Sequence, residues 1–297
     1  MTGIIYPNGY TVGYNYASGL DDTISRLTSL SDNTGTLESC KYLGLGTVVE
    51  RGHPQPGVNL TYLQQSGDPN ANTDGGDQYT GLDRFGRVID QYWINAASGT
   101  ATDRFQYGYD RDSNVLFKAN LVDAAFSELY HANGPGNGYD PLNQLTDFRR
   151  GTLSDTNSDG VPDTVASPSH SQSWATDAVG NFASVTTDGT PVSRTHNRQN
   201  ELTAVGGVNL GYDANGNTTT DDQGHTLVYD AWNRLVAVKN GSTTLASHQY
   251  DAKGNRIVVT ESGTTTDLYY STKGQVLEER VGGDLLPKNW SRWYESL

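Results

Sequence analysis

The chain has 297 residues, a formal net charge of −14 and 34% apolar residues, with 34 glycines and 18 tyrosines. This composition favours many short strands and turns over one large dry core. The 20 Lys and Arg residues against 34 Asp and Glu residues leave no basic stripe for phosphates, which argues against nucleic-acid binding. The single cysteine, Cys40, excludes an intrachain disulfide, and no stretch approaches the roughly 20 apolar residues of a membrane span.

The first 50 residues predict a hairpin, a short helix and a strand. A Tyr-Pro-Asn-Gly turn at residues 6–9 would form the hairpin. Within residues 18–32, Ile24, Leu27 and Leu30 follow two aspartates at helical spacing, which predicts about two helical turns. Strand character then resumes in the segment that follows.

Two later segments are also distinct from the strands around them. Residues 66–76 are rich in Gly, Asn and Asp and predict a surface loop. Residues 123–131 predict one or two helical turns.

Residues 104–109 and 115–120 have strand character and predict the two arms of a hairpin.

From residue 79 onward, strands alternate with copies of one phrase, Tyr-Asp-x-x-Gly/Asn followed by a polar and an apolar residue. Each position serves a hairpin: Tyr closes a strand, Asp accepts hydrogen bonds from the backbone just ahead, and Gly or Asn adopts a positive φ. Such a phrase is typical of a type I turn followed by a left-handed bulge residue. The predicted turn residues are Asp83, Gly86, Asp110, Asn114, Asp140, Asn143, Asp177, Gly180, Asp213, Gly216, Asp230, Asn233, Asp251 and Gly254.

The spacing of the copies indicates a repeat architecture. The late copies begin at Tyr212, Tyr229, Tyr250 and a degraded Tyr270, with steps of 17, 21 and 20 residues. Periods of about 20 residues are typical of repeat proteins. In residues 87–94 both alternating sets of side chains mix apolar and polar members, so neither face of the strand is cleanly buried. We therefore expect an all-β protein of roughly two dozen strands, in which antiparallel β-hairpin repeats coil into a curved sheet or hollow shell.

These motifs resemble the RHS/YD-repeat family over roughly residues 79–281. The resemblance implies a wound β-sheet that either encloses a toxic C-terminal domain or forms the body of a cell-surface adhesion protein. Residues 1–297 are then one YD/RHS-repeat segment of a longer shell, secreted or at the cell surface in its parent protein. No signal peptide precedes the turn at residues 6–9, and residues 288–297 contain no closing element. We therefore expect the sequence to begin and end inside the array.

An acidic insertion at residues 151–173 departs from the repeat. Within it, oxygen donors at relative positions 1, 3, 5, 7 and 9 and a glycine at position 6 resemble the first part of an EF-hand-type calcium loop. Position 12 is Ala166 rather than a carboxylate, and Pro162 adjoins the site. The segment is therefore either a simple linker or a weak calcium site. The candidate ligands are Asp155, Asn157, Asp159, the carbonyl of Val161, and Asp163.

Nothing in the sequence predicts catalysis or a cofactor other than calcium. The six histidines are far apart in sequence and form no metal-binding pair, and no nucleophile elbow is present. A catalytic acid occurs once, whereas the turn aspartates recur. We expect a passive scaffold around a polypeptide, either a C-terminal toxin domain or the rest of a longer shell. The alternative is an adhesion or carbohydrate-binding module that uses aromatic side chains such as Trp232, Trp290, Trp293 and Tyr294.

Overall fold

The computed structural model describes residues 2–63, 81–131, 138–282 and 284–285. The predicted loop at residues 66–76 lies outside them, as do Trp290, Trp293 and Tyr294. The described part of the chain contains 27 strands, one short α-helix and one 3-10 helix. Strand pairs in both units are antiparallel, which confirms the predicted all-β hairpin architecture.

The chain forms two compact units. The first comprises Met1–Ile4, Thr11–Asp177 and Ser184–Pro191, and the second comprises Ile5–Tyr10, Ala178–Ala183 and Val192–Leu297. Both contain copies of the repeated turn. The prediction of a single repeat segment over residues 1–297 stays a prediction.

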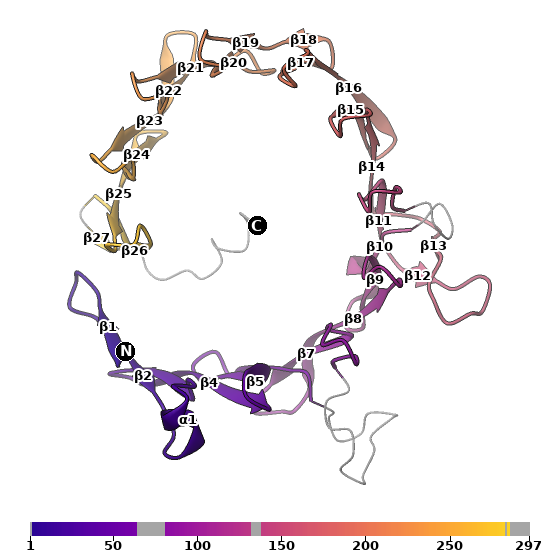
Figure 1. The fold of residues 1–297 in the computed structure, drawn as a ribbon, viewed down its shortest axis with the longest axis vertical. Coiled ribbons are helices and arrows are strands. Elements are labelled where there is room, and N and C mark those ends of the chain that lie inside the picture. The colour runs from indigo at the N-terminus through magenta and orange to yellow at the C-terminus, as the bar shows by residue number, and fades with distance from the viewer. Residues whose placement is uncertain (1, 64–80, 132–137, 283, 286–297) are drawn as a thin grey trace. The chain divides into compact units, whose positions relative to one another are not determined.

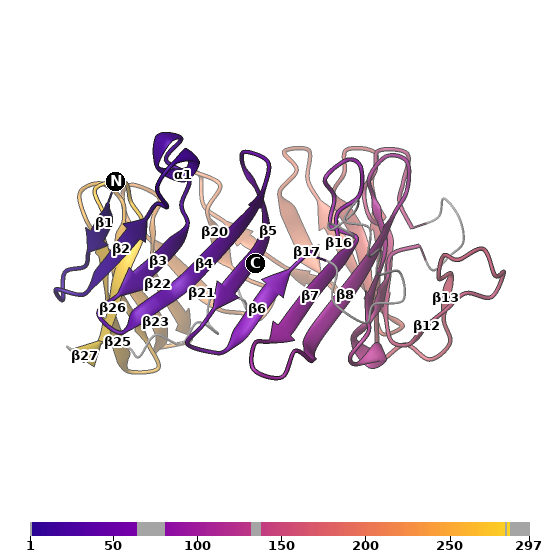
Figure 2. The same ribbon diagram turned by 90° about the horizontal axis from the view of Figure 1, so that it is seen from below.

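In the first unit, each strand of the main sheet pairs with the next one along the chain, except that β14 follows β11. Figure 2 shows β4 to β8 lying side by side. The strands are β2 (Thr11–Asn15), β3 (Ser29–Asp32), β4 (Gly35–Leu43), β5 (Thr47–His53), β6 (Val58–Thr61), β7 (Asp90–Asn95), β8 (Ala101–Tyr109), β9 (Val115–Asn120), β10 (Glu128–Leu129), β11 (Asp147–Arg150) and β14 (His170–Thr176). In sequence, β1 (Gly3–Ile5) precedes them and β15 (Phe182–Thr187) follows.

The second unit repeats the same sequential order. Strands β16 (Thr190–His196), β17 (Leu202–Val205) and β18 (Val208–Asn209) pair in turn. A nine-stranded sheet follows, in which every strand neighbours the next one along the chain (Figure 1). Its strands are β19 (Gly211–Tyr212), β20 (Thr218–Thr220), β21 (Thr226–Tyr229), β22 (Leu235–Asn240), β23 (Thr243–Tyr250), β24 (Arg256–Glu261), β25 (Thr264–Tyr270), β26 (Val276–Val281) and β27 (Asp284–Leu285).

The predicted helix within residues 18–32 is wrong beyond its first turn. Helix α1 spans only Leu20–Thr23. Ser25 has a φ of 55°, which a continuing right-handed helix does not allow. Leu30 then lies in β3, paired with Tyr14 on one side and Glu38 on the other. Pairing on both edges therefore outweighs a local helical spacing of apolar residues.

The helical turn predicted within residues 123–131 is short. It is the 3-10 helix η1 (Ala124–Phe126), whose first turn is capped by the Asp123 carboxylate, which accepts from the Ala125 N–H at 3.1 Å. Strand β10 follows after a single residue. The partner strands β9 and β11 hold that segment extended.

The acidic insertion is more ordered than a simple linker. Strands β12 (Leu153–Ser154) and β13 (Thr164–Val165) pair as a separate two-stranded sheet. They present the acidic residues 155–163 between them. The last part of the predicted insertion, from His170 onward, already belongs to β14.

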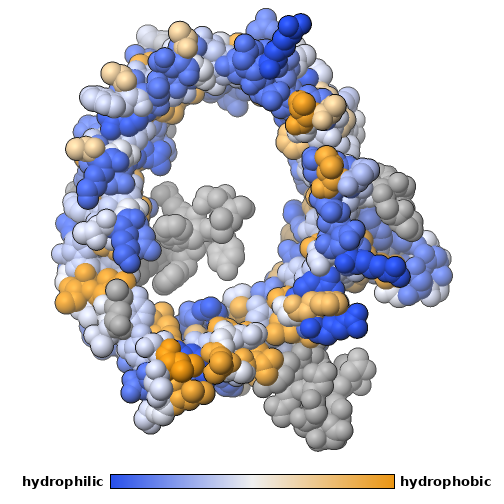
Figure 3. Space-filling view, in the orientation of Figure 1, coloured by the Kyte–Doolittle hydropathy of each residue, from blue (hydrophilic) through white to orange (hydrophobic). Residues whose placement is uncertain are grey.

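Few side chains are fully buried, as a sheet that is wet on both faces requires. Strand β7 has one buried residue, Ile94, and its other residues are half-buried. Figure 3 shows polar side chains over most of the face in view, with apolar ones in small groups. Among the described residues, the buried apolar side chains are Val49, Leu60, Ile94, Leu129, Val165 and Ala204. The buried polar ones are Thr61, Asn120, Ser127, His131, Asp147, His248 and Glu278.

Candidate functional site

The repeated turn is built by one aspartate, as the copy led by Asp213 illustrates. The Asp213 N–H donates to the Asn217 carbonyl at 2.9 Å, and the Gly216 N–H donates to the Asp213 carbonyl at 3.1 Å. Asp213 Oδ1 accepts from the N–H groups of Asn215 and Asn217, both at 2.9 Å. Its Oδ2 accepts from Asn217 Nδ2 at 2.8 Å. One carboxylate therefore satisfies three donors and closes a five-residue turn.

The same geometry recurs in both units. In the copies led by Asp83, Asp110, Asp140, Asp230 and Asp251, one carboxylate oxygen accepts the N–H groups two and four residues ahead. In unit 2, a register shift directly before Tyr229 and Tyr250 places a bulge at the strand end. Positive φ values occur at Gly86 (78°), Asn143 (60°), Gly180 (89°), Gly216 (82°), Asn233 (60°) and Gly254 (86°). Gly180 belongs to the copy whose first turn residue in sequence is Asp177.

One predicted turn residue has a different role. In the copy led by Asp110, the residue with positive φ is Ser113, at 71°, and not Asn114. Asn114 instead donates from its backbone N and its Nδ2 to the Asp110 carboxylate, both at 2.8 Å. The left-handed position is set by its distance from the aspartate, so serine occupies it even though asparagine is adjacent.

Hydrogen bonding lowers the pKa of three turn carboxylates in the second unit. The side-chain amides of Asn217 and Asn255 are the largest cause that lowers the pKa of Asp213 and of Asp251. At Asp230, partial burial opposes the charge, but hydrogen bonds from the side chain and backbone of Arg234 outweigh it and the pKa is lowered. Each of these carboxylates is therefore committed to its own turn and is poorly suited to accept a proton.

The predicted set of turns omitted at least one copy, the turn led by Asp221. Asp221 Oδ1 accepts from the N–H groups of Gln223 and His225 at 3.0 and 2.8 Å, and Gly224 has a φ of 82°. His225 Nδ1 lies 2.8 Å from Asp221 Oδ2. Thr220 precedes the aspartate. A search for Asp-x-x-Gly followed by Asn, Arg or His would have found it.

The tyrosine of the phrase does more than end a strand. In five copies its hydroxyl donates to the backbone carbonyl of the residue that directly follows the preceding repeated turn. This bond links successive hairpins and was not predicted. The pairs are Tyr109 with Val88 (2.7 Å), Tyr139 with Val115 (2.7 Å), Tyr212 with Leu202 (2.7 Å), Tyr250 with Leu235 (2.8 Å) and Tyr270 with Arg256 (2.7 Å).

Arginine after the left-handed residue adds a second link. Arg234 Nε donates to Asp230 Oδ2 at 2.7 Å, and its Nη1 donates to the Asp251 carbonyl of the next turn at 3.2 Å. Its guanidinium also lies 4.8 Å from the Tyr250 ring centroid. Arg87 makes the equivalent contacts in the first unit, to Asp83 (2.6 Å), the Asp110 carbonyl (3.3 Å) and the Tyr109 ring (4.5 Å).

The acidic loop closes mainly through its own backbone. Asp155 accepts from the N–H groups of Ser158 and Gly160, each at 2.8 Å. Asp163 accepts from the backbone N and the hydroxyl of Thr156, and the hydroxyl bond is the largest cause that lowers the pKa of Asp163. These two carboxylates are thereby held by different parts of the loop.

The remaining candidate calcium ligands also bond to one another. Asp159 accepts from the Val161 N–H at 2.8 Å and from Asn157 Nδ2 at 3.1 Å. Across the described ranges, no three His, Cys, Asp or Glu side chains gather closely enough to hold a metal ion. In this conformation the loop does not present a converged set of carboxylates. Calcium binding by residues 155–163 stays a prediction.

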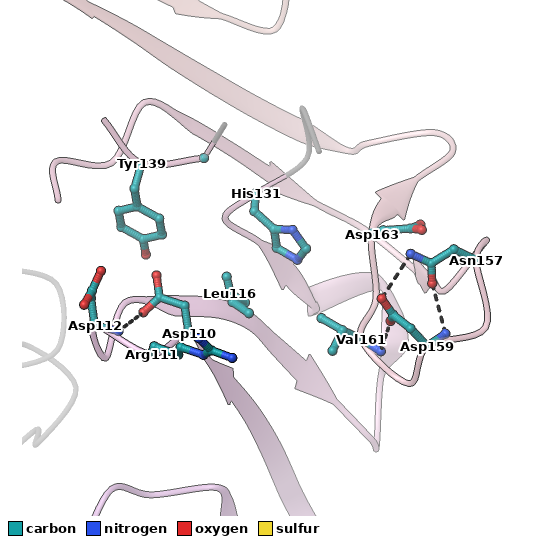
Figure 4. A pocket seen from close by; sticks show the side chains of 11 residues that line it. Asp110, Arg111, Asp112, Leu116, His131, Tyr139, Asn157, Asp159, Val161 and Asp163 are labelled. Carbon is teal, nitrogen blue, oxygen red and sulfur yellow. Dashed lines mark hydrogen bonds between the residues drawn. The ribbon is translucent and has the colours of Figure 1, made fainter. Parts of the chain in front are cut away.

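Four of the five candidate ligands border a cavity of about 450 Å³ in the first unit (Figure 4). The turn led by Asp110 forms the opposite wall, and His131 lies between the two. The cavity is lined by Asp110, Arg111, Asp112, Leu116, His131, Gly138, Tyr139, Asn157, Asp159, Val161 and Asp163.

In the described part of the chain, no helix is both long enough and apolar enough to cross a membrane.

Comparison with known proteins places the repeated turn in a wider context. The family model described as RHS Repeat matches residues 229–266, which include the turns led by Asp230 and Asp251. The chain is 40% identical over 100 residues to the tRNA3(Ser)-specific nuclease WapA of Bacillus spizizenii, a match that covers 32% of this chain and 4% of the nuclease. It therefore corresponds to a small part of that protein.

Two solved structures share the fold at 15% sequence identity. The Photorhabdus luminescens Tc holotoxin pore, with the TccC3-D651A mutation, matches with a TM-score of 0.59 and covers 92% of this chain and 14% of its own. The complex TcdB2-TccC3-Cdc42 matches with a TM-score of 0.55, covering 92% of this chain and 15% of its own. At this level of identity the likeness concerns the fold alone.

Proposed function

We propose that this chain, which belongs to the RHS/YD-repeat family, is a wall segment of a β-shell that encloses or scaffolds a polypeptide and performs no catalysis itself. The observation that carries the proposal is the use of the repeated residues. The carboxylates of Asp213, Asp230 and Asp251 each accept hydrogen bonds from their own turn. The hydroxyls of Tyr250 and Tyr270 donate to a carbonyl of the preceding hairpin. The residues that recur thus build a wall.

The enclosed polypeptide is proposed to be a C-terminal toxin domain of a longer protein that is secreted or displayed at the cell surface. The similarity to part of a nuclease and to part of a Tc holotoxin supports this choice. The nuclease is far longer than the matched region, so its activity is proposed to belong to a different segment. A sheet with few fully buried side chains suits a wall that has water on both faces.

The test is limited proteolysis of the longest polypeptide that the host makes from this reading frame. The expected result is a fragment outside the repeat that resists protease in the native protein and is cleaved rapidly after denaturation. Mass spectrometry would identify the protected fragment. Equal cleavage of that fragment before and after denaturation would contradict enclosure.

A carbohydrate-binding or adhesion module is the second candidate, and one exposed side chain favours it. Trp232 sits at the tip of its turn with 74% of its surface exposed, and the Arg234 guanidinium lies 5.1 Å from its ring centroid. An exposed indole provides a flat surface on which a sugar ring can stack. If this candidate is right, the chain should bind saturably to a glycan on an array, and Trp232→Ala should abolish that binding. The shell proposal expects no glycan binding.

A further inference from the structure

The cavity between the Asp110 turn and the acidic loop carries an excess of negative charge. Its lining includes four carboxylates, from Asp110, Asp112, Asp159 and Asp163, against one guanidinium, from Arg111. Within the described residues none of the four carboxylates forms an ion pair. The bonds to Asp110 and Asp159 come from neutral N–H groups, which leave the negative charge uncompensated. The cavity therefore attracts a cation.

A buried histidine gives the cavity an unused hydrogen-bonding group. His131 is 6% exposed, and its Nε2 is buried without a hydrogen-bond partner. The ring extends toward the acidic loop, on the side of Val161 and Asp159 (Figure 4). A buried polar atom without a partner is costly, and such atoms are rare in native proteins. A ligand that donates a hydrogen bond to this imidazole would remove that cost.

The backbone fixes the position of this histidine. Gly138 packs directly against the backbone of Tyr130 and His131, so that a Cβ built at Gly138 would lie 1.8 Å from the Tyr130 carbonyl oxygen and 2.4 Å from the His131 Cα. Tyr139, the next residue, is held by its hydroxyl bond to the Val115 carbonyl. These contacts hold the backbone beside His131 at the edge of the cavity.

The size and shape of the cavity select an extended ligand over a single ion. A volume of about 450 Å³ lies in the range of small-molecule sites, roughly 300–1,000 Å³. No three metal-ligating side chains converge among the described residues. Leu116, Val161 and the Tyr139 ring add apolar surface between the carboxylates. This combination fits a charged head carried on an apolar stem.

From these observations we propose that the cavity binds an organic cation, a guanidinium or ammonium group on an alkyl stem of the size of an arginine or lysine side chain. The cationic head pairs with the carboxylate of Asp159 on the side of His131, the stem contacts Leu116 and Val161, and Asp112 adds negative charge from the opposite wall. One N–H of the head donates to His131 Nε2. Cation binding in this cavity is separate from the proposed enclosure of a polypeptide, and either proposal can fail without the other.

The test compares L-argininamide with L-citrullinamide, which has nearly the same shape but no charge on its side chain, by calorimetric titration of the intact chain. Argininamide is expected to bind about tenfold or more tightly than citrullinamide, because one charge-assisted contact is worth roughly that factor. Binding should weaken as salt is raised from about 0.05 to 0.5 M, because salt screens an exposed charge pair. Equal binding of the two amides, or binding of neither, would overturn the proposal.

Variants locate the site. Asp159→Asn removes the carboxylate that pairs with the head, and it should weaken argininamide binding severalfold. Asp112→Asn should weaken it as well, because it removes charge from the opposite wall, at an exposed side chain that forms no hydrogen bond with the described residues. Asp22→Asn, at an exposed carboxylate on α1 away from the cavity lining, is the matched control and should bind as the unmodified chain does. An effect of Asp22→Asn equal to that of Asp112→Asn would contradict the assignment.

Two further titrations identify the occupant. If acetyl-Gly-Arg-Gly-amide binds as well as argininamide, the natural ligand is a side chain of a polypeptide. If only argininamide binds, the natural ligand is a small metabolite. Either result supports the binding of an organic cation in the cavity. Calcium chloride should not compete with argininamide at equal concentration. Displacement by calcium together with tight calcium binding would replace this proposal with a metal site.

Discussion

Aspartate leads the repeated turn because a short carboxylate can reach several backbone donors at once. Asp251 accepts from the N–H groups of Lys253 and Asn255 through one oxygen and from Asn255 Nδ2 through the other. An asparagine at the same place, as in the Asn197 turn, offers a single acceptor oxygen, which still serves the two backbone donors. The charge therefore mainly strengthens the bond to the side chain four residues ahead.

The lowered pKa of Asp251, caused first by the Asn255 side chain, predicts a loss of stability in acid. A carboxylate whose pKa is lower in the folded chain than in the unfolded chain stabilises the fold while it is ionised. This stabilisation is fully present above the ordinary pKa of about 3.9. It is lost as the pH falls through the lower pKa of the folded chain. Asp251→Asn should lower the melting temperature at pH 7, and the difference from the unmodified chain should shrink below about pH 4.

The control for this pH series is Asp222→Asn, at an exposed carboxylate that forms no hydrogen bond with the described residues. Its melting temperature should follow that of the unmodified chain across the series. A constant difference between Asp251→Asn and the unmodified chain from pH 7 to pH 3 would contradict the role given to the charge.

Hairpins are the elements that the repeat assembles, and their coupling depends on side chains rather than on the turns alone. The hydroxyls of five motif tyrosines reach the residue after the previous turn. Arg87 and Arg234 reach the carbonyl of the next turn. The two links operate in opposite directions along the chain. The hairpins that carry these links are therefore tied to a neighbour in addition to the backbone ladder.

Removing one tyrosine hydroxyl tests this coupling. Tyr250→Phe deletes the bond to the Leu235 carbonyl and leaves the ring in place, so the free energy of unfolding should fall by about 1 kcal/mol. Amide exchange in β22 and β23 should accelerate, because those strands carry the two ends of the bond.

Tyr269→Phe provides the matched control, since Tyr269 is 38% exposed and its hydroxyl forms no hydrogen bond within the described part of the chain. Its stability should change by no more than a few tenths of a kcal/mol. Equal effects of the two substitutions would show that the hydroxyl bond of Tyr250 does not link the hairpins.

At the scale of the whole molecule, two compact units are built from the same repeated turn. In repeat proteins each element contacts mainly its neighbours in sequence, so stability is a sum of local terms and cooperativity over the whole chain is weak. The strand order of the nine-stranded sheet, in which every neighbour is the next strand in sequence, matches that description.

Thermal unfolding should therefore depart from a two-state transition. The enthalpy measured by calorimetry should exceed the van't Hoff enthalpy derived from the shape of the transition, because different parts of the chain unfold separately. Agreement of the two enthalpies in a reversible scan would show that the units unfold as one and would contradict this prediction.

The sequence by itself determined the repeated turns, because every bond that closes a turn lies within five residues. Asp230 and Asn233 could be assigned from spacing and side-chain chemistry, and the phrase also predicted an all-β fold of hairpins. Where local preference was weak the sequence misled: the apolar spacing through Leu30 indicated a helix, yet pairing with Tyr14 and Glu38 made that segment a strand.

Only the tertiary structure decided which distant residues meet. The tyrosine hydroxyls find carbonyls 10 to 24 residues away, a distance that no turn pattern encodes. The cavity joins Asp112, His131 and Asp159, which come from separate hairpins and carry no shared motif. Backbone turns follow from neighbouring residues, whereas contacts between hairpins follow from strand register and from the order in which the sheet is assembled.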